Sequence, residues 1–182
     1  LNLNASASIG GTSTLYSLGV TDSYFLDTRW TAGFELYKTE RDWTDFSEDA
    51  TGGALKGGHS LGLHSKGLLT YRYEQKDVYD VSDSASLTIR DQEGNSVLSS
   101  LTGTLSRNTT DYRLDPTRGG ASSFSTEYAG LGGTDHFVKF ELSHRHFFPL
   151  FWQTVLSLNG HIGYVVKTAD DMVPVSEKFF LG

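Results

Sequence analysis

The chain opens on a strict alternation of apolar and polar residues. Asn and Ser occupy the even positions of the first nine residues, and the odd positions are Leu1, Leu3, Ala5, Ala7 and Ile9. A repeat of two places alternate side chains on opposite faces of an extended strand, whereas a helix needs a period of 3.6. The first nine residues therefore predict a strand, and the segment 10–13 after it predicts a tight turn.

The same alternation returns along the chain and predicts nine strands. They cover residues 1–9, 16–21, 30–37, 55–65, 69–81, 96–109, 120–130, 136–147 and 152–167. Several exceed the five or six residues common in soluble proteins and suit a tilted crossing of a bilayer. One short helix is predicted inside the loop that follows residue 81, capped by Asp83 or Ser84 and ending before Gly94.

The polar face of these strands is composed mainly of small side chains. Ser, Thr and Gly together supply 60 of the 182 residues, and Arg, Lys and Glu are scattered among them. A soluble sandwich would carry many more charges on its outer face, so a crowded, wet barrel interior fits better. Aromatic residues near strand ends, where interfacial girdles lie, agree with this interpretation: Tyr24, Phe25, Trp30, Trp43, Phe147, Phe148, Phe151 and Trp152. The predicted fold is all-β, a transmembrane antiparallel up-and-down β-barrel.

Length and charge refine this prediction. The chain has a net charge of -7 and a sequence pI near 5.2, which argues against a nucleic-acid partner. It has no cysteine, which excludes disulfides and cysteine-bound metals, and no apolar run near 18 residues that would make a helical span. Nine strands would leave two unpaired edges, which a bilayer cannot satisfy. We therefore expect about half of a larger barrel.

No sequence pattern predicts catalysis or a cofactor. The chain lacks a Gly-x-Ser-x-Gly frame, a phosphate-binding glycine loop and a dinucleotide fingerprint, so we expect a non-enzymatic protein without cofactors. His144 and His146 share a strand face, but no third metal ligand is evident, which favours interfacial or lumenal imidazoles. The Gly-Gly pairs at 10, 52, 57, 119 and 132 are assigned to turns or strand edges. The acidic cluster is interpreted as a solvated loop: Glu40, Asp42, Asp45, Glu48 and Asp49.

Charged side chains on the predicted lumenal face are the candidate functional residues. They are Arg72, Glu74, Glu127, Lys139, Glu141 and Arg145. Such charges can pair across neighbouring strands and set the shape and selectivity of a channel. Simple hydration and cross-strand pairing of the interior is an equally good interpretation.

Several motifs resemble the barrel domain of the BamA family, the central subunit of the machinery that assembles β-barrels in Gram-negative bacteria. They are Leu26-Asp27-Thr28, Phe34-x-Leu36-Tyr37, Tyr71-x-Tyr73-Glu74, Asn108-Thr109-Thr110-Asp111, Glu127-Tyr128-Ala129-Gly130 and Gly132-Gly133. The most specific are the turn Asp115-Pro116-Thr117-Arg118-Gly119 and the final Pro174-Val175-Ser176-Glu177-Lys178-Phe179-Phe180-Leu181-Gly182. In this order they cover nearly the whole chain.

The resemblance implies a place for this chain within a barrel of about sixteen strands. The nine strands resemble the third to the eleventh, and the final segment resembles the approach to the sixth extracellular loop. The closing strands and the periplasmic POTRA domains are expected to lie outside residues 1–182. The implied function is insertion and folding of other β-barrel proteins in the bacterial outer membrane. The implied partners are the lipid bilayer, nascent outer-membrane proteins and accessory lipoproteins of an assembly complex.

Two other functions share parts of this pattern. A polypeptide-translocating transporter of the two-partner secretion or TamA type shares the fold and the loop. A diffusion porin would instead use the lumenal charges, and its ion selectivity would depend on Arg72, Lys139 or Arg145.

Overall fold

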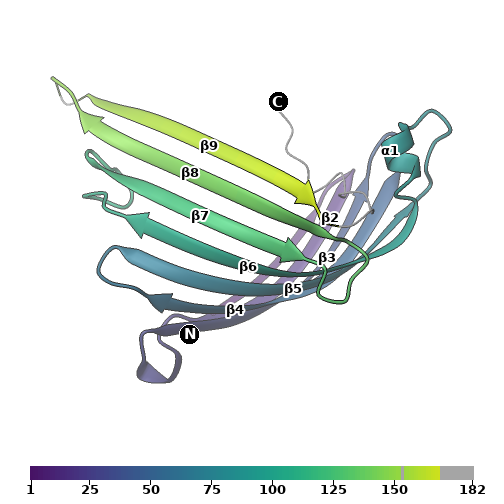
Figure 1. Ribbon diagram of the computed structural model, residues 1–182, viewed down its shortest axis with the longest axis horizontal. Helices are drawn as coiled ribbons and strands as arrows, with labels where there is room; N and C mark the ends of the chain where they lie inside the picture. Colours follow the sequence, from purple (N-terminus) through teal and green to yellow (C-terminus); the bar gives the residue numbers. More distant parts are fainter. Residues whose placement is uncertain (153, 169–182) are drawn as a thin grey trace.

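In the part of the chain that the structure describes, nine antiparallel strands form one sheet in which neighbours in sequence are neighbours in space (Figure 1). The computed structural model describes residues 1–152 and 154–168. The strands are β1 (Asn2–Ile9), β2 (Ser13–Asp22), β3 (Trp30–Asp42), β4 (Ser47–Ser60), β5 (Ser65–Tyr79), β6 (Gly94–Asn108), β7 (Gly119–Ala129), β8 (Phe137–Pro149) and β9 (Val155–Lys167). The predicted all-β, up-and-down architecture is confirmed.

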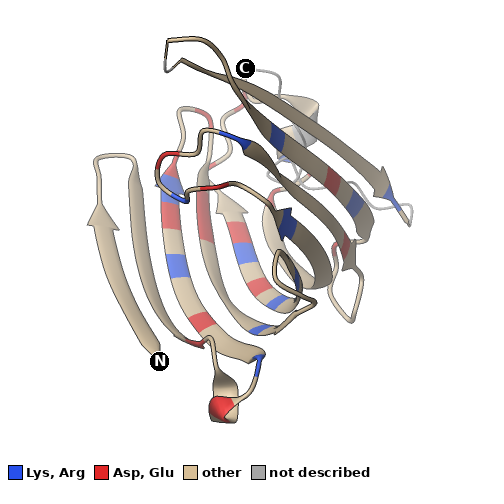
Figure 2. Ribbon diagram, turned by 90° about the vertical axis from the view of Figure 1, so that its left-hand side faces the viewer, with Lys and Arg blue, Asp and Glu red and all other residues tan. Residues whose placement is uncertain are grey.

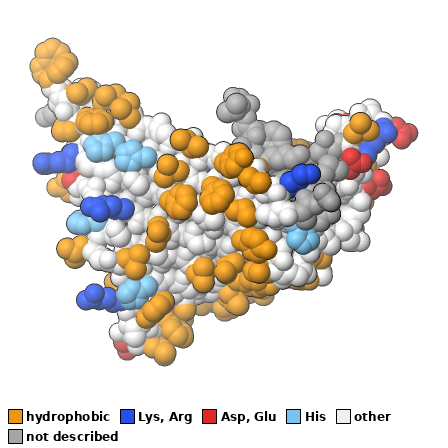
Figure 3. All heavy atoms as spheres, in the orientation of Figure 1, with side chains coloured by type: hydrophobic (Ala, Val, Ile, Leu, Met, Phe, Trp, Pro, Cys, Tyr) orange, Lys and Arg blue, Asp and Glu red, His pale blue; other side chains and the backbone are white. Residues whose placement is uncertain are grey.

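The sheet curls into a trough (Figure 2), and its two faces differ in chemistry. Small and polar residues line the concave face, where Ser100, Ala129 and Glu74 are buried. Large apolar side chains cover the convex face and stay exposed, as Leu55 (62%) and Ile162 (68%) illustrate (Figure 3). An apolar surface of this extent is typical of contact with lipid rather than water.

Strand register aligns the apolar residues of the convex face in rows. Leu105, Phe124, Leu142 and Ile162 are direct partners across β6, β7, β8 and β9. A shift of one residue in any strand would turn its apolar side chains toward the polar trough. The alternation in the sequence therefore fixes both the face and the register.

The acidic cluster lies in strands, not in the long solvated loop that the sequence predicted. β3 extends to Asp42 and β4 begins at Ser47, so Glu40, Asp42, Glu48 and Asp49 belong to strands. Only residues 43–46 form the turn, which is closed by a bond from the Trp43 N–H to the Phe46 carbonyl (2.9 Å). The prediction that β4 begins at residue 55 was wrong because this end of the hairpin carries polar side chains on both faces and shows no apolar alternation.

The predicted helix exists but is shorter and begins later. α1 (Leu87–Arg90) is a single turn, and its N-cap Ser86 makes no side-chain cap bond. Neither Asp83 nor Ser84 caps it, because the helix begins at Leu87, after both residues, and the Ser84 N–H donates to the hydroxyl of Ser82 in the preceding turn. The 3-10 turn η1 (Phe25–Asp27) lies between β2 and β3. Within residues 1–152 and 154–168, no helix has the length and hydropathy needed to cross a membrane.

One of the glycine pairs occupies the middle of a strand. Gly52 and Gly53 lie in the middle of β4, whereas Gly57 and Gly58 lie near its end. The assignment of Gly52 and Gly53 to a turn or strand edge was therefore wrong. The packing around Gly52 explains why a side chain is missing there.

Candidate functional site

An ion pair on the concave face joins two strands that are not neighbours. The Arg72 Nη2 on β5 donates to the Glu127 Oε1 on β7 at 3.0 Å, over the intervening β6. At the point of crossing, β6 carries Ser100, whose hydroxyl donates to the same Oε1 at 2.7 Å. The small Ser100 side chain leaves room for the guanidinium and adds a second donor to the carboxylate.

A second bridge crosses β4 in the same way. The Tyr37 hydroxyl on β3 donates to the Glu74 Oε2 on β5. Gly52 is the register partner of both residues, so the tyrosine ring lies directly over it. A Cβ at Gly52 would lie 2.7 Å from the Tyr37 hydroxyl oxygen and 2.8 Å from Cζ. Glycine at this position therefore makes the bridge possible.

Lysine and arginine side chains extend the network toward the 43–46 turn. The Lys76 Nζ lies 3.9 Å from both the Glu74 Oε1 and the Glu48 Oε2. The Glu48 Oε1 lies 3.7 Å from the Arg41 Nη1. The buried Glu74 carboxylate thus receives a hydroxyl donor and a cation, which offset the cost of removing it from water.

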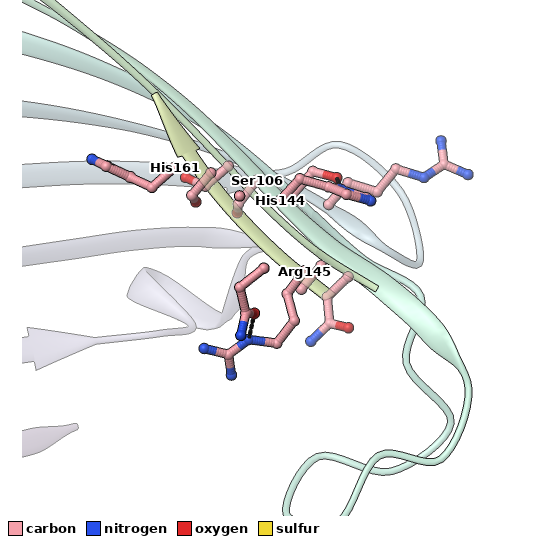
Figure 4. A pocket seen from close by; sticks show the side chains of 12 residues that line it. Ser106, His144, Arg145 and His161 are labelled. Atoms are coloured by element: carbon pink, nitrogen blue, oxygen red, sulfur yellow. Dashed lines mark hydrogen bonds between the residues drawn. The ribbon is translucent and has the colours of Figure 1, made fainter. Parts of the chain in front are cut away.

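The remaining predicted charges lie farther along the trough. The Lys139 Nζ on β8 lies 3.5 Å from the Glu141 Oε1, and the Ser125 hydroxyl is 3.5 Å from the Glu141 Oε2. The Arg145 Nε donates to the Asn159 Oδ1 at 2.5 Å, in a hollow near the other end of β8 (Figure 4). The structure thus joins Arg72 with Glu127, places Glu74 in the bridge over β4, and leaves Arg145 in separate surroundings.

Sequence reasoning missed several members of this network: Tyr37, Arg41, Glu48, Lys76 and Ser100. Tyr37 was assigned to the polar face of its strand, and an aromatic residue among Thr, Gly and Glu was the available signal. Glu48 was missed because its strand was predicted to start later. No local signal marks Ser100 in a chain with so many serines.

The 109–118 turn is organised around one carboxylate, that of Asp111. Its Oδ1 accepts from the backbone N–H groups of Tyr112 (2.9 Å), Thr117 (2.9 Å) and Arg118 (3.2 Å), and its Oδ2 accepts from the Thr117 hydroxyl. The Thr117 hydroxyl, followed by these backbone donors, holds the pKa of Asp111 well below its usual range. The carboxylate therefore stays charged and fixes the turn.

The predicted turn motif lies in this loop and at its end. Asp115, Pro116 and Thr117 lie in the loop between β6 and β7. Gly119 begins β7 with φ +93°. A Cβ at Gly119 would lie 2.2 Å from the Thr109 carbonyl oxygen. Of these residues, Thr117 binds the central carboxylate and Gly119 permits the close approach of the chain. The predicted loop-approach residues lie outside the described residues: Pro174, Ser176, Glu177, Phe179, Phe180 and Gly182.

The histidines do not form a metal site among the described residues, which hold no group of three or more potential ligands. His144 and His146 share the convex face of β8, with ring centroids 5.8 Å apart. His161 on β9 and Arg145 lie on the opposite side of the sheet from His144 (Figure 4).

Replacing Gly52 with alanine is expected to expel the Tyr37 ring and break its bond to Glu74. Because Glu74 is 7% exposed, loss of a donor to this buried group should lower the free energy of unfolding by about 1–3 kcal/mol. Urea titration of the refolded protein in detergent micelles measures this change. Gly57→Ala is the matched control, since it lies on the same strand and its added Cβ would meet no atom within 4 Å. Equal losses in both variants would contradict the packing role of Gly52.

Comparison with known proteins identifies the family. The family model of the Omp85 superfamily domain matches residues 1–182. The chain belongs to the Omp85 superfamily. Two curated relatives are outer membrane protein assembly factors BamA: that of Nitratidesulfovibrio vulgaris is 28% identical over 152 residues, and that of Neorickettsia risticii is 27% identical over 170 residues. These alignments cover 82% and 91% of the chain.

A solved structure shows the same fold. The crystal structure of BamA from Haemophilus ducreyi lacking POTRA domains 1–3 matches 99% of the chain and 38% of its own, with a TM-score of 0.86 and 16% sequence identity. The chain spans only 19% and 23% of the lengths of the two curated relatives. Together these findings make the chain a member of the Omp85 superfamily, located in the outer membrane, whose nine-stranded sheet matches part of a BamA barrel.

Proposed function

We propose that this Omp85 chain is part of a longer barrel protein that folds and inserts other β-barrel proteins in the outer membrane. The observation that carries the proposal is the match of the whole nine-stranded sheet to a BamA barrel, together with two relatives named as outer membrane assembly factors. In this proposal β1 to β9 correspond to the third to eleventh strands of about sixteen. The segment after β9 leads to the sixth extracellular loop.

Loop lengths support an orientation for the barrel. Outer-membrane barrels have long extracellular loops and short periplasmic turns. The longest connection between the described strands, residues 80–93, lies at the same end of the sheet as the 43–46 turn. We place this end outside the cell and the 109–118 turn on the periplasmic side.

Charge pairing supports a structural rather than a selective role for the lumenal residues. Arg72 is engaged by Glu127, and Lys139 by Glu141, so these cations are held against carboxylates of the same wall. A porin relies on charges that remain available to permeating ions. The proposed role is non-enzymatic, with the bilayer, nascent barrel proteins and accessory lipoproteins as partners.

Depletion of the full-length protein tests the function. Unrelated outer-membrane barrels should then fail to reach their folded, heat-modifiable forms, while their unfolded chains accumulate in the periplasm. Normal assembly of those barrels, with loss of one secreted polypeptide, would instead indicate a translocating transporter of the two-partner secretion or TamA type. Normal assembly with loss of ion conductance that depends on Arg72, Lys139 or Arg145 would indicate a porin.

A further inference from the structure

A row of polar residues interrupts the apolar band on the convex face of β6, β7 and β8. Two residues beyond the apolar row of Leu105, Phe124 and Leu142, the register places a polar row on the same face. Its members are Arg107 on β6, Ser122 on β7, His144 on β8 and Gly160 on β9. On β6 and β7 the polar row borders the apolar band, and on β8 and β9 the exposed apolar side chains of Phe148, Leu156 and Leu158 follow beyond it.

The side chains of this row present hydrogen-bond donors and positive charge. The Ser122 hydroxyl lies 2.8 Å from the His144 Nδ1, so Nε2 is the ring nitrogen that can bind a ligand. His146 follows on the same face and contacts Phe148, with ring centroids 4.4 Å apart. Within the part of the chain that the structure describes, no carboxylate lies within ion-pairing distance of Arg107.

Space for a ligand lies beside these groups. A Cβ at Gly160 would meet no atom within 4 Å, which leaves open surface next to His144. Histidine and basic side chains gather at this end of the convex face beside the apolar side chains (Figure 3). The polar row itself carries positive charge from Arg107, although the whole chain has a net charge of -7.

We propose that Arg107, Ser122 and His144 bind the phosphate of an anionic glycerophospholipid. A guanidinium with an adjacent hydroxyl and imidazole supplies charge-assisted donors for a phosphate diester. The neighbouring row of Leu105, Phe124 and Leu142 gives the acyl chains an apolar surface. This inference rests on the proposed orientation of the barrel, which places the row in the periplasmic leaflet.

Lipid selectivity of the full-length protein in phosphatidylcholine vesicles tests the site. Electron paramagnetic resonance of spin-labelled lipids gives the association of phosphatidylglycerol relative to phosphatidylcholine. Arg107→Gln should reduce this preference about fivefold, the effect of one basic residue near a membrane surface. His144→Gln should reduce it less, and Arg107→Lys should retain most of it.

Arg145→Gln is the matched control, because Arg145 follows His144 directly but lies on the concave side of β8 (Figure 4). It should leave the lipid preference unchanged. An unchanged preference in a folded Arg107→Gln variant, or an equal loss in Arg145→Gln, would overturn the proposal. Displacement of the labelled lipid by inorganic phosphate, or a stronger preference for lipid A, would overturn the assignment to a glycerophospholipid. Because barrel assembly is measured separately by depletion, failure here leaves the proposed function standing.

Discussion

Replacing Gly119 with alanine is expected to prevent closure of the 109–118 turn and to lower the free energy of unfolding by more than about 4 kcal/mol. The new Cβ would lie 2.2 Å from the Thr109 carbonyl oxygen and 2.8 Å from its carbon, both of which belong to rigid backbone. The same backbone pairs with the next residue, since the Thr109 N–H donates to the Gly120 carbonyl at 2.8 Å. Relief of the clash would therefore break the start of β7.

The variant Gly132→Ala measures the cost of an unfavourable backbone φ alone, without the steric clash that Gly119→Ala adds. Gly132 has the same φ of +93°, but a Cβ there would meet no atom within 4 Å. It should cost only about 1–3 kcal/mol, as expected for a side chain in this region of φ. Urea titration in detergent micelles and the fraction of heat-modifiable protein in the membrane measure both variants. A similar loss in the two variants would show that steric overlap at Thr109 is unimportant.

Replacing Arg72 with methionine is expected to destabilise the sheet by about 2 kcal/mol, below the 3–5 kcal/mol typical of a fully buried pair because the trough is wet. The change removes the guanidinium from the Glu127 carboxylate, whose side chain is 12% exposed, while the Ser100 hydroxyl still donates to it. Glu127→Gln should remove much of this penalty, so the double variant should be more stable than additivity predicts. A double-mutant cycle of unfolding free energies measures the coupling.

The ion pair of Lys38 and Glu40 is the exposed control for the ion pair of Arg72 and Glu127. Its side chains are 50% and 44% exposed, and such pairs contribute about 0.2–1 kcal/mol. The same cycle on Lys38→Gln and Glu40→Gln should therefore give a much smaller coupling energy. A coupling of Arg72 with Glu127 no larger than this value would mean that the bridge over β6 adds no stability.

Alternation predicted the number and order of the strands because lipid on one side and water on the other impose opposite chemistry on successive residues. The predicted start of β4 was wrong because the two faces of this strand do not differ in polarity there. Ser47 to Ala54 carry acidic or small side chains on both faces of β4, so the strand is held by its ladder to β3 and β5 without an apolar stripe. Periodicity cannot detect a strand of this kind.

The candidate site was only partly predictable for a different reason. The polar face of each strand could be assigned, which selected Arg72 and Glu127 as charges of the same side. Their contact depends on the register of β5 with β6 and on that of β6 with β7. These registers are set by two connections of unequal length, residues 80–93 and 109–118. The bridge from Tyr37 to Glu74 depends further on Gly52. The glycine is visible in the sequence, but its role in leaving room for the Tyr37 ring can be predicted only when β3 and β5 are known to flank it.

The two bridges also have a mechanical consequence. Each joins next-nearest strands, so it spans about 10 Å of sheet on the inside of a curve. Flattening the wall would stretch the bond from Arg72 to Glu127 and the bond from Tyr37 to Glu74, so both bonds resist a loss of curvature. The segment from β3 to β7 is therefore a stiff arc, and elastic deformation of the barrel should concentrate in the strands beyond it.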